Sequence, residues 1–157
     1  MCNCNDPNLP TEANAAKGWC IASLVIGIIG CINFLGGTNG LLGGVGGLLM
    51  IVAGAMPICC IKSEKGTGGN AGCIYKGSFA CLLLAAILEV VCIAMIGIAL
   101  SAVNEVDVNG LNKLRDFALT ILYIAVGITA IVFVFASIAA YKCLRAFQAI
   151  ASNGQKA

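Results

Sequence analysis

A glutamate inside an apolar stretch is the residue of this chain best placed to do chemistry. Glu89 lies near the middle of residues 78–100 and is the only charged residue there. An acid inside a membrane-spanning helix is costly when ionised, so it must be protonated, paired or facing water. By depth along the apolar stretches, Thr129 is its expected hydrogen-bond partner. The pair fits either a protonated carboxyl that clamps two helices together or a site on a proton or ion pathway.

Cysteine is the second reactive residue type, with ten copies in a chain that has no histidine. Cys2 and Cys4 lie in the polar N-terminal tail, and Cys59 and Cys60 end an apolar stretch. Juxtamembrane cysteines are the usual acceptors for S-palmitoylation, and two acyl chains would hold a tail on a bilayer. The alternative for Cys59 and Cys60 is that they are simply small apolar residues. Their C-x-C and C-C spacings do not match structural zinc sites, so we expect no metal and no cofactor.

Glycine is concentrated in one apolar stretch, where it recurs at helical spacing. Small residues on one face let helix backbones approach closely in lipid, where there is no hydrophobic reason to associate. The predicted helix-packing residues, spaced by four or by seven, are Gly36, Gly40, Gly43, Gly44, Gly47 and Gly54. Their partner is either another helix of the same chain or a second subunit.

Four long apolar stretches must position these residues. They cover residues 19–35, 41–61, 78–100 and 117–141. A helix needs about 20 apolar residues to cross a hydrocarbon core of about 30 Å. The chain is 60% hydrophobic and 10% charged, against about 25% charged in an average soluble domain. We therefore predict an all-α fold, a four-helix transmembrane bundle forming one integral, multi-pass membrane domain over residues 1–157.

The distribution of charge predicts the topology. Lysine and arginine favour the cytoplasmic side of a membrane. The basic residues of the tails and of the middle loop, which would share one side, are Lys17, Lys62, Lys65, Lys76, Lys142, Arg145 and Lys156. The two segments predicted to lie outside, 36–40 and 101–116, hold only Lys113 and Arg115 and no cysteine. Both termini are therefore expected to be cytoplasmic.

The same composition argues against several classes of function. The chain has no histidine, no nucleophile–base pair and no phosphate-binding loop after a strand. A net charge of only +2 gives no basic patch for nucleic acid. We expect neither an enzyme nor a nucleic-acid-binding protein.

Two runs of residues resemble tetraspanins. The run GVGGLLMIVAGAMPICCIKSEKG is similar to their second helix, which ends in Cys-Cys before a short charged loop. The run KGSFACLLLAAILEVV is similar to their third helix, which opens with a cysteine and a leucine run and carries a glutamate. Tetraspanins also have a large, disulfide-bonded second outside loop, whereas residues 101–116 are few and cysteine-free. The resemblance implies a tetraspan organiser that lacks this recognition head.

The chain also resembles the four-helix rotor proteolipid of vacuolar-type proton pumps. The two are similar in length, in glycine richness and in one helix-embedded glutamate, here in ILEVVCIAMIGIALS. In that family the glutamate lies on the last helix, whereas Glu89 lies on the third apolar stretch. This resemblance implies a proton pathway.

The leading hypothesis is a non-enzymatic tetraspan membrane protein that packs laterally and organises or stabilises a membrane assembly. Its partners would be the lipid bilayer and either further copies of itself or the other subunits of a larger membrane complex. The alternative is a proton or ion pathway that uses Glu89.

Overall fold

All of the chain that the structure describes is built from four helices and the short segments that flank them. The structure, a computed structural model, describes residues 9–32, 38–61, 70–105 and 112–154. The helices are α1 (Thr11–Ile32), α2 (Thr38–Cys59), α3 (Ala71–Glu105) and α4 (Asn112–Gly154). The predicted all-helical fold with four helices is confirmed for these residues.

The helices run beyond the apolar stretches that predicted them. α1 begins at Thr11 rather than at residue 19, and α4 ends at Gly154 rather than at residue 141. The carbonyl of Pro10 accepts the Ala13 N–H at 3.0 Å, which starts the first turn before a run of good helix formers. The extensions are helical because one face of each still packs in the core, where Ala13 and Ala146 are fully buried.

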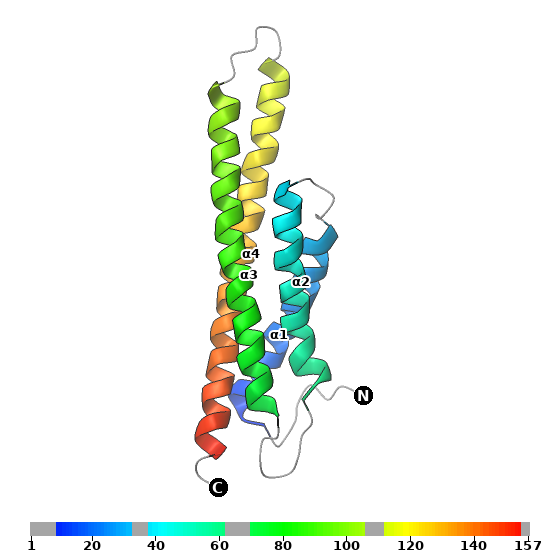
Figure 1. Cartoon of the computed structure of the whole chain (residues 1–157), viewed down its shortest axis with the longest axis vertical. Helices are drawn as coiled ribbons and strands as arrows, with labels where there is room; N and C mark the ends of the chain where they lie inside the picture. The colour runs from blue at the N-terminus through cyan, green and yellow to red at the C-terminus, as the bar shows by residue number, and fades with distance from the viewer. Residues whose placement is uncertain (1–8, 33–37, 62–69, 106–111, 155–157) are drawn as a thin grey trace.

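The four helices pack as a ring. Each helix contacts the next along the chain, and α1 closes the ring against α4. A Cβ added to Gly46 would lie 3.3 Å from Oε1 of Glu89, and one added to Gly77 would lie 3.5 Å from Sδ of Met56. The residue number rises along α2 from Gly46 to Met56, whereas it falls along α3 from Glu89 to Gly77. The two helices are therefore antiparallel. The start of α1 and the end of α4 lie together at the lower end of Figure 1.

The α3–α4 hairpin is longer than the α1–α2 hairpin and stands clear of it at the upper end of Figure 1. α2 begins eight residues from Gly46, or about 12 Å at about 1.5 Å per residue. α3 continues sixteen residues beyond Glu89, or about 24 Å. α3 therefore extends about 12 Å past the start of α2. We call residues 95–105 and 112–128 the upper hairpin.

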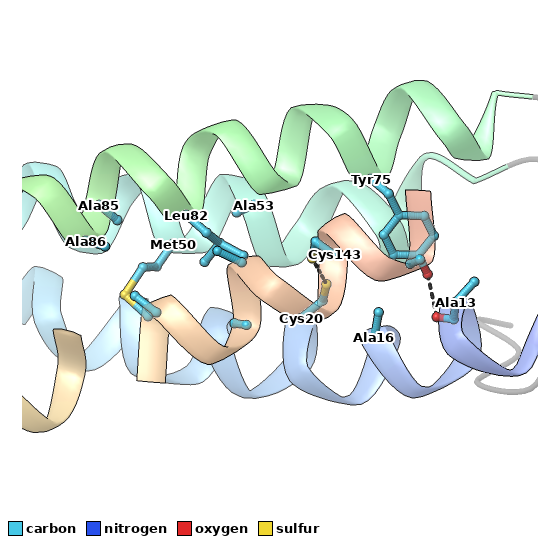
Figure 2. Packing of buried hydrophobic residues seen from close by; sticks show 14 of the residues in the cluster. Ala13, Ala16, Cys20, Met50, Ala53, Tyr75, Leu82, Ala85, Ala86 and Cys143 are labelled. Carbon is cyan, nitrogen blue, oxygen red and sulfur yellow. Dashed lines mark hydrogen bonds between the residues drawn. The ribbon is translucent and has the colours of Figure 1, made fainter. Parts of the chain in front are cut away.

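The core is a seam of mostly small side chains. On α3 most of the buried residues recur at alternating intervals of four and three, with Ala86 buried beside them: Ala71, Tyr75, Ser78, Leu82, Ala85, Glu89, Cys92 and Ile96. This is the interval of a coiled-coil seam, which keeps one face of a helix against its partners over many turns. Figure 2 shows Tyr75, Leu82 and Ala85 pointing toward the other helices. The Tyr75 hydroxyl donates to the Ala13 carbonyl at 2.7 Å and ties α3 to α1.

The outer surface of the ring is strongly apolar. Within the described part of the chain, three helical segments are long and apolar enough to cross a membrane: Thr11–Cys31, Ala71–Val103 and Arg115–Ser152. α2 contributes a shorter apolar segment, Gly43–Cys59. Large aliphatic side chains on the outside, such as Ile98 and Ile131, are 66% and 70% exposed. These features indicate a membrane protein, because a soluble fold would bury much of this surface.

Candidate functional site

Glu89 lies on the inner seam of α3, opposite a glycine of α2. Its side chain is only 7% exposed. An ideal Cβ built on Gly46 would lie 3.3 Å from the Oε1 atom, so the carboxyl occupies the space that a side chain at Gly46 would fill. The seam positions on either side, Ala85 and Cys92, are buried and carry no charge. Glu89 therefore lies on a face of α3 that points into the bundle.

The expected hydrogen bond between Glu89 and Thr129 is not formed. The Thr129 hydroxyl donates to the Ala125 carbonyl of its own helix at 2.8 Å. Among the residues that the structure describes, Glu89 has no hydrogen-bond donor. A hydroxyl in a helix commonly bonds the carbonyl four residues back, and this local bond is made here. A buried carboxyl between uncharged seam residues suits a neutral acid better than an ionised one.

The glycines of α2 face two different neighbours. A Cβ on Gly47 would lie 2.8 Å from the Gly27 carbonyl oxygen, and one on Gly54 would lie 2.8 Å from Cβ of Leu24, both on α1. Gly46, one residue before Gly47, faces α3 instead. Successive residues on a helix point about 100° apart, so adjacent glycines serve the two neighbours of α2 in the ring.

The other predicted packing glycines are placed as follows. Gly44 is buried, and its carbonyl accepts from Sγ of Cys31 at 3.7 Å. A Cβ on Gly43 would meet nothing within 4 Å. Gly40 belongs to α2, but its surroundings are not described, and Gly36 lies outside the described residues.

Two glycines that lie at close helix–helix contacts, Gly27 and Gly46, were not predicted from the sequence. Gly27 of α1 would place a Cβ 2.6 Å from the Gly47 carbonyl oxygen, so α1 supplies half of the close approach. Its signal was present, since Gly27 and Gly30 interrupt an otherwise bulky apolar run. Gly46 was not predicted as a packing residue because no other glycine lies four or seven residues from it.

The predicted acylation sites lie only partly within the described residues. Cys59 ends α2 and Cys60 follows it, and both are exposed free thiols. Cys2 and Cys4 lie outside the described residues. An exposed thiol at a helix end can accept an acyl chain. Acylation itself stays a prediction. No group of three or more potential metal ligands occurs in the described ranges.

Comparison with known proteins gives no relative. The chain matches no protein-family model, no curated protein and no solved structure. A function must therefore be argued from the chain's own residues.

Proposed function

We propose that this chain is a non-enzymatic, multi-pass membrane protein that assembles side by side with other membrane helices, through further copies of itself or within a larger complex. In this proposal all four helices lie in the bilayer, both termini are cytoplasmic, and acylated cysteines anchor the inner ends. The upper hairpin provides the surface for assembly. The observation that carries the proposal is how little of this hairpin is covered by the rest of the chain.

The upper hairpin presents apolar side chains in several directions. Among its described side chains, only Ile96 is buried. The large exposed side chains of the upper hairpin are Met95, Ile98, Phe117, Ile121, Tyr123, Ile124 and Ile128. Such a surface suits lipid or another membrane helix.

Two exposed glycines favour a protein partner over lipid alone. Gly97 and Gly127 lie on the exposed surface of the upper hairpin, and a Cβ on either would meet nothing within 4 Å. A glycine inside a helix costs about 1 kcal/mol relative to alanine. At Gly27 and Gly47 a close helix contact offsets that cost, whereas Gly97 and Gly127 have no such contact within the chain. Helix association in membranes uses small residues of this kind.

Replacing both Gly97 and Gly127 by leucine should dissociate the assembly into monomers without unfolding the monomer. The added side chains would point into open space in the monomer but would hold a neighbouring helix away. We expect at least a tenfold shift toward the small species on native gels after mild detergent extraction. The matched control is Gly18→Leu, because Gly18 is an exposed helical glycine of α1 with the same open surroundings. An unchanged large species in the double variant, or no large species in the parent, contradicts the proposal.

Glu89 supports a second candidate function, a proton or ion pathway. The supporting observation is that Glu89 is only 7% exposed. Its carboxyl accepts no hydrogen bond from any residue that the structure describes. Glu89→Gln keeps the size of the side chain and removes the acid. Under the assembly proposal, the variant keeps its native-gel size, and passive ion flux in reconstituted vesicles is the same for both proteins. A flux in the parent that falls by more than tenfold in Glu89→Gln, with assembly intact, would favour the pathway instead.

A further inference from the structure

Two cysteines from opposite ends of the chain meet inside the bundle. Sγ of Cys20 on α1 and Sγ of Cys143 on α4 lie 3.7 Å apart, although 123 residues separate them in sequence. Both are free thiols and both side chains are fully buried. Figure 2 shows the two side chains pointing toward each other between α1 and α4. Either sulfur can donate to the other.

Small neighbours allow this contact. Ala16 lies one turn from Cys20, and Ala139 and Ala146 lie on either side of Cys143, all fully buried. With methyl groups on these seams, the two helices approach closely enough for cysteine side chains to touch. A disulfide needs a sulfur–sulfur distance of about 2.05 Å, so small side-chain rotations and a slight helix shift would close the gap.

No other described pair of cysteines has this geometry. Within the described ranges, Cys20 and Cys143 are the only two cysteines whose sulfur atoms are in contact. Cys59, Cys60 and Cys73 are exposed, and the remaining buried thiol, Cys92, lies beside Glu89 on the α3 seam. Among the described cysteines, a cross-link within the folded chain would therefore be specific to Cys20 and Cys143.

The pair also lies at the interface where a cross-link would matter most. The contact between α1 and α4 is the least extensive of the four that close the ring. An open apolar groove of about 370 Å³ lies along it, lined by Trp19 of α1 and by Ala130, Ile131, Val134, Phe135 and Ile138 of α4. The groove reaches Trp19, the residue before Cys20, and a cross-link here would reinforce the least extensive contact of the ring.

We propose that Cys20 and Cys143 form a reversible disulfide in response to a peroxide, and that this bond locks α1 to α4. One thiol gives up its proton as its sulfur attacks a peroxide oxygen; the oxygen–oxygen bond breaks, water leaves and a sulfenic acid forms. The second thiol then attacks that sulfur, the sulfur–sulfur bond forms and water leaves. Two thiols and one hydrogen peroxide give one disulfide and two waters. Exchange with a small dithiol restores both thiols.

The test uses the full-length protein in detergent micelles. Exposed thiols are first blocked with N-ethylmaleimide, which leaves the buried pair free. The protein is then treated with hydrogen peroxide, unfolded in denaturant and digested. We expect a peptide pair joined through Cys20 and Cys143 and the loss of two thiols that can be tagged after unfolding, both reversed by dithiothreitol. The oxidised protein should also unfold at a higher SDS fraction than the reduced protein.

Matched variants separate this pair from general oxidation. Cys20→Ser and Cys143→Ser should each abolish the linked peptide and the shift in SDS midpoint, whereas Cys92→Ser should keep both. The parent's peptide map decides the question even if a variant fails to fold. The proposal is overturned if the folded parent yields only sulfinic or sulfonic acids at these positions, or if the link appears only when peroxide is added after unfolding.

Discussion

Replacing Gly54 by alanine should push α1 away from α2 and lower the free energy of unfolding by about 3 kcal/mol. A Cβ at this position would overlap the Cys20 carbonyl oxygen and lie 2.8 Å from Cβ and 2.9 Å from the backbone N of Leu24. None of these atoms can be moved by changing a side-chain rotamer, so a helix must shift. The measurement is unfolding in mixed micelles of rising SDS content. Trp19, the only tryptophan, reports on the change through its contact with Phe135 at 5.1 Å between ring centroids.

Gly43→Ala is the control for this substitution on the same helix. Nothing lies within 4 Å of a Cβ at Gly43, so the added methyl causes no overlap. Alanine should raise the free energy of unfolding by about 1 kcal/mol through its better helix propensity. Equal effects of the two substitutions, in sign and size, would show that α1 and α2 do not approach as closely at Gly54 as the structure has it.

Replacing Leu82 by alanine should lower the free energy of unfolding by about 2 kcal/mol. Leu82 is fully buried on the α3 seam and is among the largest fully buried side chains of the described residues. Its neighbours on the seam are mostly alanine and serine, which cannot rearrange to fill a cavity. We place the effect at the low end of the measured range because, in a bilayer, a leucine released from the core enters lipid rather than water. The loss of packing contacts remains.

Leu83→Ala provides the matched comparison. Leu83 is the next residue along the helix and is 46% exposed on the outer surface. Its truncation should change the free energy of unfolding by less than about 0.5 kcal/mol. A larger effect at Leu83 than at Leu82, in the same SDS titration, would mean that the buried and outer faces of α3 are exchanged.

The number of helices followed from apolar runs, but their lengths did not. Hydropathy marks the part of a helix that suits hydrocarbon and says nothing about how far the helix continues into water. The extension of α4 carries a second signal, since Ala139, Cys143, Ala146 and Ile150 keep intervals of three and four beyond the apolar run. The start of α1 is likewise marked by Pro10, because proline suits the first turn of a helix and not its interior.

The candidate site was only partly predictable for a different reason. A spacing of seven predicts that Gly47 and Gly54 share one face, because the period depends on local helix geometry alone. Which helix meets that face depends on the order of helices around the ring. The approach of Gly46 to Glu89 and of Cys20 to Cys143 joins segments far apart in the chain, and no local pattern specifies such a register. Depth along the apolar stretches predicted that the Thr129 hydroxyl bonds Glu89. The hydroxyl instead donates to the Ala125 carbonyl of its own helix.

The central claim is that hydrocarbon surrounds these helices. The direct test is extraction of membranes from expressing cells with alkaline carbonate, followed by extraction of the pellet with a mild detergent. We predict that the protein stays in the carbonate-washed pellet and leaves it only with detergent. Release by carbonate as a monodisperse species, stable in buffer without detergent or lipid, would contradict the account.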